Sequence, residues 1–121
     1  MKFFSGTAEY RKTLPSPIPR EGGRLVLELG RVCDFAEVIV NDGAPVVFWR
    51  PPYEVDVTEA ARRGELSLRI RVTNLWPNRL IGDDALPRSE RTTKTSWRHW
   101  GKHDALRPSG LLGPVRLAHW L

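Results

Sequence analysis

Residues 65–73 read Glu-Leu-Ser-Leu-Arg-Ile-Arg-Val-Thr, so that apolar and polar side chains alternate along the whole stretch. In an extended chain, successive side chains point to opposite sides. Leu66, Leu68, Ile70 and Val72 therefore share one side, while the serine, the arginines and the threonine share the other. This two-residue period predicts a strand of an antiparallel sheet that is buried on one side and faces water on the other.

The same period recurs on both sides of this stretch. We expect strands within residues 25–29, 36–40, 53–57 and 115–118. Asn41-Asp42-Gly43 predicts a tight turn after the second of these strands, because glycine tolerates positive φ angles and asparagine and aspartate can approach them. Pro51-Pro52 must lie at an edge, a bulge or a strand break, since proline donates no hydrogen bond to a sheet.

Two segments depart from the strand pattern. Residues 58–64, Thr-Glu-Ala-Ala-Arg-Arg-Gly, predict a helix of one or two turns, with Thr58 as its N-cap and Gly64 as a left-handed stop. Residues 75–110 show little alternation and hold three of the five tryptophans. A connection of this length inside a compact domain is usually functional or disordered. Its tryptophan content favours a long, ordered and packed loop.

Short strands separated by turn residues favour an antiparallel β-sandwich or barrel. A length of 121 residues suits one domain, so we expect a single domain over residues 1–121. The one cysteine, Cys33, excludes an intramolecular disulfide and a cysteine-based zinc site. No apolar run approaches the ~20 residues of a membrane helix, so we expect no membrane partner.

The net charge of +5 raises the question of nucleic-acid binding. The basic residues are spread along the chain: Arg69 and Arg71 flank Ile70, and no four basic residues are consecutive. Such a distribution is typical of the solvated side of a sheet. We therefore expect no nucleic-acid partner.

The sequence lacks the familiar catalytic patterns. It contains no Gly-x-Ser-x-Gly elbow and no lysine-bearing phosphate loop, and no carboxylate pair is suggested for glycoside hydrolysis. His99 and His103 have the spacing of helical metal ligands, but Trp100-Gly101 is poor helix context, so we expect two loop histidines. Asp83 and Asp84 could contribute to a structural calcium site, although the spaced acidic series of a calcium loop is missing. We expect no catalytic residue and no other cofactor.

Aromatic and polar residues instead gather near predicted strand ends and in the long loop. A sugar ring presents an apolar C–H side and a rim of hydroxyls, so an aromatic ring with convergent arginine, asparagine and aspartate side chains suits it. The same tryptophans could equally close the ends of a sandwich core. The candidate sugar-binding residues are Trp49, Arg50, Tyr53, Trp76, Asn78, Arg79, Asp83, Trp97 and Trp100.

Essentially the whole chain, the long loop included, resembles a known family. Residues 38–74, which include Phe-Trp-Arg-Pro-Pro-Tyr-Glu at 48–54, resemble the sugar-binding, galactose-binding-domain-like jelly roll of family 2 glycoside hydrolases. Residues 74–83, Asn-Leu-Trp-Pro-Asn-Arg-Leu-Ile-Gly-Asp, and residues 108–115, Pro-Ser-Gly-Leu-Leu-Gly-Pro-Val, more specifically resemble the C-terminal domain of large bacterial α-L-rhamnosidase-like enzymes. Residues 4–13 are similar to the first strand of that domain.

The chain departs from the family pattern around one hairpin. Asn41-Asp42-Gly43 stands where the family usually has Asn-Gly, Val46 stands at a second turn glycine, and Leu66 stands at an asparagine. These departures affect the hairpin and one strand entry rather than the overall fold.

The resemblance implies an antiparallel jelly-roll β-sandwich with one short helix and a long ordered loop. It also implies an accessory domain of a polysaccharide-degrading glycoside hydrolase, whose catalytic carboxylates lie on a parent catalytic domain. By the same resemblance the parent enzyme would be exported, to the periplasm or outside a bacterial cell. An isolated module must cover the surface that met its parent, so a homo-oligomer is a further expectation, which analytical ultracentrifugation can check.

Two functions remain open from the sequence. The first is a non-catalytic carbohydrate-binding module for plant or bacterial polysaccharides or oligosaccharides. The second is a structural docking domain without a sugar site, in which residues 74–83 form an internal brace. Under the second, Arg79 pairs with Asp83 and Trp76 lies in the core.

Overall fold

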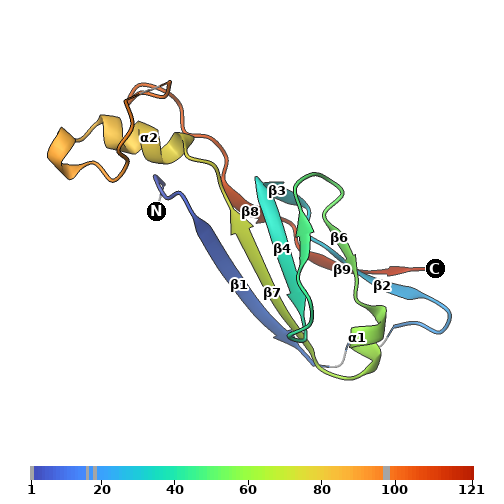
Figure 1. Cartoon of the computed structure of the whole chain (residues 1–121). Coiled ribbons are helices and arrows are strands. Elements are labelled where there is room, and N and C mark those ends of the chain that lie inside the picture. Colours follow the sequence, from blue (N-terminus) through green and yellow to red (C-terminus); the bar gives the residue numbers. More distant parts are fainter. Residues whose placement is uncertain (1, 16, 18, 97–98) are drawn as a thin grey trace.

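The computed structural model describes residues 2–15, 17, 19–96 and 99–121, and it consists mainly of antiparallel strands (Figure 1). The strands are β1 (Thr7–Leu14), β2 (Arg24–Glu28), β3 (Arg31–Cys33), β4 (Phe35–Val40), β5 (Val46–Phe48), β6 (Glu54–Asp56), β7 (Leu66–Thr73), β8 (Gly110–Gly113) and β9 (Arg116–Trp120). The helices are α1 (Thr58–Arg62), α2 (Pro77–Asp84) and the short 3₁₀ helix η1 (Arg88–Glu90).

The strands form two larger sheets and a two-stranded extension. One sheet has the order β1-β7-β4-β5, the other has the order β6-β2-β9, and β3 pairs with β8. All these pairs are antiparallel. The pairing of β3 with β8 continues that of β2 with β9, because Gly30 lies between β2 and β3 and Gly113 ends β8 before β9 begins.

Both sheets contribute to one apolar core, which confirms the predicted β-sandwich. The alternation in residues 65–73 is reproduced in β7, where buried residues alternate with half-buried ones. The core side chains come from β2, β3, β4, β7, α1 and the adjoining turns: Leu25, Leu27, Leu29, Val32, Ala36, Val38, Tyr53, Val57, Ala61, Leu66, Leu68, Ile70 and Val72. The strands predicted within residues 25–29, 36–40, 53–57, 65–73 and 115–118 correspond to β2, β4, β6, β7 and β9.

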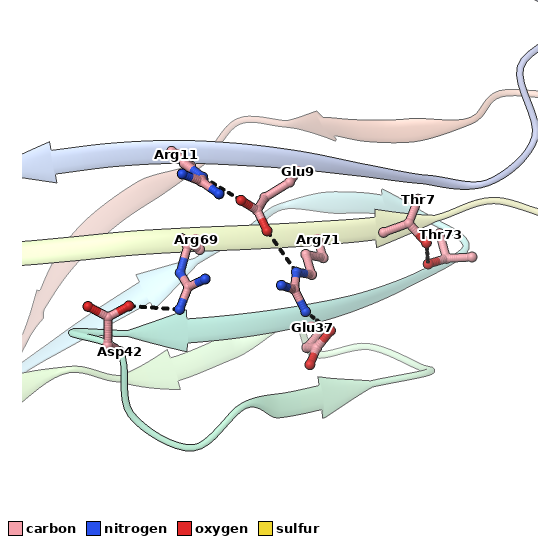
Figure 2. A network of polar contacts seen from close by, with 8 residues as sticks. All are labelled: Thr7, Glu9, Arg11, Glu37, Asp42, Arg69, Arg71 and Thr73. Atoms are coloured by element: carbon pink, nitrogen blue, oxygen red, sulfur yellow. Dashed lines mark hydrogen bonds and ion pairs between the residues drawn. The ribbon is translucent and has the colours of Figure 1, made fainter.

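The other side of the β1-β7-β4-β5 sheet carries matched charges (Figure 2). Glu9 on β1 lies opposite Arg71 on β7, and its carboxylate accepts hydrogen bonds from Arg71 at 2.7 Å and from Arg11. The hydrogen bond from Arg71, followed by that from Arg11, lowers the pKa of Glu9. Arg69 likewise reaches Asp42 at 2.7 Å. The spread of charge in the sequence therefore corresponds to a solvent-facing sheet side, as predicted.

The predicted turn and helix are both present, and Gly64 has a positive φ after the helix, but Gly43 and Thr58 do not hold the positions expected of them. Positive φ angles occur at Asn41 (48°) and Asp42 (55°) rather than at Gly43, whose N–H donates to the Val40 carbonyl. Thr58 is not the N-cap of α1, since the cap position is Val57. The Thr58 hydroxyl instead accepts a hydrogen bond from the N–H of Leu25 at 2.9 Å, which ties the helix to β2.

The segment predicted as a long loop contains more structure than expected. It holds α2 and η1 and leads directly into β8. Figure 1 shows α2 and the chain that follows it beyond one end of the strands, close to the N-terminus. Within the described residues, no helix is long and apolar enough to cross a membrane.

Candidate functional site

The side chain of Asn74, at the end of β7, fixes the N-terminal segment. Its amide oxygen accepts from the N–H of Gly6 at 2.8 Å, and its amide nitrogen donates to the Phe4 carbonyl at 2.7 Å. The residue is buried. The first residue of the string that carries the family resemblance therefore makes structural contacts within the chain.

Asn78, on the first turn of α2, makes a similar pair of hydrogen bonds to a distant loop. Its amide nitrogen donates to the Arg107 carbonyl at 2.8 Å, and its amide oxygen accepts from the Arg107 N–H at 2.7 Å. Both polar atoms of this buried side chain are thus engaged. Asn78 thus holds the backbone of the loop, and its role as a hydroxyl partner stays a prediction.

Arg79 and Asp83 form the ion pair that the brace hypothesis predicts. Their side chains approach to 2.9 Å, and Asp83 is completely buried. The same carboxylate accepts hydrogen bonds from the N–H and the hydroxyl of Thr93, both at 2.6 Å. Burial alone would raise the pKa of Asp83, but these hydrogen bonds and the Arg79 charge outweigh it, so the pKa is lowered. Both residues therefore contact each other within the chain, and their role as hydroxyl partners stays a prediction.

The two adjacent aspartates serve different parts of the loop. Asp83 faces Arg79 and Thr93, whereas Asp84 accepts from the N–H of Lys102 at 2.9 Å. Among the described residues, no group of three or more histidine, cysteine, aspartate or glutamate side chains could hold a metal ion. His99 and His103 lie outside any helix. The ring of His99 packs edge-on against the ring of Trp100, with 5.1 Å between the two ring centres.

Three of the predicted aromatic residues, Trp49, Tyr53 and Trp76, differ in how far they are exposed to solvent. Trp76 is 66% exposed, so the brace hypothesis is wrong in placing it in the core. Trp49 is 72% exposed and carries the guanidinium of Arg50 over its ring at 4.9 Å. Tyr53 belongs to the core, and its hydroxyl donates to the Asp34 carbonyl at 3.2 Å. Because its ring packs inside the sandwich, Tyr53 offers no open platform to a sugar.

One cavity of about 550 Å³ lies where α2, the loop before β8 and the β3–β8 pair meet. We call it the Trp100 cavity. Polar, charged and aromatic side chains line most of it. Its lining residues are Arg31, Cys33, Asp34, Asn74, Leu75, Pro77, Asn78, Trp100, Asp104, Ala105, Leu106, Arg107, Pro108 and Ser109.

The aromatic ring in this cavity is paired with a cation. The guanidinium carbon of Arg107 lies 4.4 Å from the centre of the Trp100 ring. Two carboxylates complete the polar lining, and each is partly used by a backbone N–H. Asp34 accepts from Leu75 at 2.9 Å, and Asp104 accepts from Gly101 at 2.7 Å.

Of the predicted site residues, Asn78 and Trp100 line the cavity. Trp49, Arg50, Tyr53, Trp76, Arg79 and Asp83 do not, and Trp97 lies outside the described residues. Sequence reasoning missed the charged lining residues Arg31, Asp34, Asp104 and Arg107. The pairing of β3 with β8 brings Arg31 and Asp34 close to the loop that contains Asp104 and Arg107. Neither strand shows an alternation of apolar and polar residues, so this pairing could not be predicted from the sequence.

Comparison with known proteins connects the chain to glycoside hydrolases. No protein-family model matches it. It is 43% identical, over 143 aligned positions, to a protein of Formosa agariphila named "Putative beta-glucuronidase", and the match covers 97% of this chain and 12% of that protein.

Solved structures show the same relation. The rhamnosidase of Novosphingobium sp. PP1Y matches with a TM-score of 0.80 and 44% identity, over 95% of this chain and 11% of the rhamnosidase. An FMN-binding β-glucuronidase of F. prausnitzii L2-6 matches less well, with a TM-score of 0.50 and 26% identity over 62% of this chain. The chain thus spans about one-ninth of the rhamnosidase chain and a similar part of the Formosa protein, and it is similar to one small domain of such enzymes.

Proposed function

We propose that this chain is a non-catalytic accessory domain of a longer glycoside hydrolase and that it binds carbohydrate in the Trp100 cavity. The observation that carries this proposal is the convergence of Trp100, Arg107 and two aspartates around one open cavity of sugar-accommodating size. Similarity to parts of a rhamnosidase and of a β-glucuronidase-named protein supports the glycoside-hydrolase context.

The lining of the cavity suits binding better than bond cleavage. The exposed part of the Trp100 ring can contact the C–H side of a sugar, while the arginines can donate to hydroxyls and the aspartates can accept from them. Asp34 and Asp104 each accept a hydrogen bond from a backbone N–H, so both carboxylates take part in contacts that hold the chain itself. Hydrolysis would therefore rest on residues of the parent enzyme.

Titration of the folded chain by calorimetry tests this proposal. The panel contains L-rhamnose, galactose, glucuronate, and pectic and xylan oligosaccharides. We expect saturable binding of at least one class, and we expect Trp100→Ala to weaken it about tenfold or more, since the aromatic ring and its contact with the Arg107 guanidinium are both lost.

Trp49→Ala is the matched control, because Trp49 also carries a stacked arginine but does not line the cavity. This variant is expected to keep the affinity of the unmodified chain. An unchanged affinity in Trp100→Ala, with an intact fold, would remove the cavity from the binding site.

A structural docking domain is the second candidate, and a specific observation favours it. Asn74, Asn78, Arg79 and Asp83 all bond within the chain, while Leu75 and Trp76 beside them stay exposed. An exposed apolar pair on a rigid segment is suited to contact with another domain. A flat response to the whole panel, from protein shown to be folded, would favour this candidate.

A further inference from the structure

We infer that the Trp100 cavity selects an acidic saccharide, whose carboxylate is held by Arg107 with Arg31 nearby. This inference rests on the proposed function and adds to it the class of ligand. It follows from how the two arginines are held and from what the two aspartates already contact.

Arg107 is held at both its backbone and its side chain. Asn78 bonds both the N–H and the carbonyl of Arg107, and Trp100 lies against the guanidinium. The five N–H donors of a guanidinium lie in its own plane, so an aromatic ring against one side leaves them available. The planar acceptor that matches two such donors at once is a carboxylate. Arg107 is therefore a preorganised carboxylate-binding group.

Arg31 adds a second positive charge to the same cavity. It begins β3, lies opposite Gly113 on β8, and is exposed. Within the described residues, neither Arg31 nor Arg107 is part of an ion pair, whereas Arg69 and Arg71 on the sheet side of Figure 2 each have a carboxylate partner. The charge of the two cavity arginines is thus not neutralised by direct contact.

The two aspartates of the cavity orient the ligand. One oxygen of Asp34 accepts from the N–H of Leu75, and one oxygen of Asp104 accepts from Gly101, so each carboxylate is committed to its own segment. They would repel a simple anion placed beside them, but they can accept hydrogen bonds from hydroxyl groups. A ligand with a carboxylate at one end can bind the two arginines, and hydroxyls at its other end can donate to the two aspartates. A uronic acid has both kinds of group, whereas a free phosphate or sulfate has only the negative charge.

The test compares sugars that differ in one group. Glucuronate and glucose differ only by a carboxylate in place of the C6 hydroxymethyl, as do galacturonate and galactose. We expect the acid of at least one pair to bind about tenfold or more tightly than its neutral partner, since charge-assisted hydrogen bonds are about twice as strong as neutral ones. This preference should shrink as NaCl is added, because salt screens the charges of the open cavity.

Variants assign the preference to the arginines. Arg107→Gln keeps the backbone that Asn78 bonds, and it should bring the acid and neutral sugars to within about threefold of each other. Arg31→Gln should reduce the preference by a smaller factor. Arg50→Gln is the matched control, because Arg50 also stacks on a tryptophan but lies outside the cavity. Circular dichroism confirms that each variant is folded.

The outcomes separate the two claims. Equal binding of acid and neutral sugars overturns the acidic ligand and leaves the proposed function standing. Absence of binding to every sugar, by folded protein, overturns both. A preference for acids that survives both Arg107→Gln and Arg31→Gln overturns the assignment to these arginines.

Discussion

Asparagine is used twice along the segment that supports the Trp100 cavity, and each time its side-chain amide bonds two backbone groups of a distant segment. An amide is suited to this task because it carries a donor and an acceptor side by side. Asn74 thereby fixes residues 4–6, and Asn78 fixes residue 107. The position of the Trp100 cavity therefore depends on the hydrogen bonds of two amides.

Replacing Asn78 should show how much this clamp contributes. Asn78→Ala removes both hydrogen bonds and leaves the partner groups of Arg107 without them, so we expect the free energy of unfolding to fall by about 1–3 kcal/mol. Urea denaturation measures the change. Asn78→Asp keeps the acceptor but places a buried carboxylate oxygen against the Arg107 carbonyl, so its loss should be at least as large at neutral pH and should shrink when the carboxyl is protonated. A stability of Asn78→Ala equal to that of the unmodified chain would show that the clamp is dispensable.

Single residues of this segment were predictable to different degrees. The pair of Arg79 with Asp83 that the brace hypothesis predicts is present, and α2 accounts for it because residues four apart share one side of a helix. The exposure of Trp76 was not predictable, because it depends on which part of the fold packs against the start of α2. The position of Arg107 was not predictable either, because it depends on the hydrogen bonds of its backbone to Asn78 and on the contact of its guanidinium with Trp100.

Among the secondary-structure elements, the β2–β3 ribbon and the β9–β8 ribbon come into close contact at Gly30. Gly30 has a φ of 67°, and a Cβ placed on it would lie 2.5 Å from the carbonyl carbon of Gly113. Only a residue without a side chain allows the two backbones to approach in this way. The approach lets β3 and β8 continue beyond the three-stranded sheet and carry Arg31 to the cavity.

Gly30→Ala should therefore lower the free energy of unfolding by more than the cost of placing an alanine at a left-handed φ angle. A left-handed φ costs an alanine about 1–2 kcal/mol, and the contact with Gly113 adds to this. Gly22→Ala is the matched control, because Gly22 has a φ of 70° but nothing lies within reach of an added Cβ. Thermal unfolding of both variants measures the difference. Equal melting temperatures would contradict the close approach as the cause.

Strands with a clear period were predictable, and elements without one were not. β7 and β4 have one buried and one more exposed side, which leaves alternation in the sequence. β3 is only three residues long and has a register shift, while β8 begins and ends with glycine, so neither carries a legible period. In α2, Pro77 and Gly82 obscured the helical pattern, although proline at the first turn of a helix is itself a start signal.

The whole molecule combines two parts that are held together by different forces. The sandwich is held by an apolar core from both sheets. The segment that contains α2 is tied down by polar contacts of Asn74, Asn78, Asp83 and Asp84, together with the buried Leu80 and Ile81 of the helix and the ring of Phe3 against Gly82. Conditions that weaken hydrogen bonds to carboxylates should therefore act on the second part first.

Acid is such a condition, because the pKa of buried Asp83 is lowered in the folded chain. A lowered pKa means that the ionised carboxylate stabilises the fold above its unfolded pKa of about 3.9, and that this contribution is lost as the pH falls through the folded value. We expect amides of residues 77–96 to lose protection from hydrogen exchange below about pH 4, while those of β4 and β7 remain protected.

Asp83→Asn distinguishes this cause from general acid denaturation, to which the lowered pKa values of Glu9 and Asp56 also contribute. The variant keeps an acceptor for Thr93 but loses the charge facing Arg79, so its α2 segment should exchange faster already at neutral pH and respond less to acid. If the segment and the sandwich of the unmodified chain lost protection together, the two parts would form one cooperative unit. The Trp100 cavity, which lies between them, would then stay formed in acid for as long as the sandwich does.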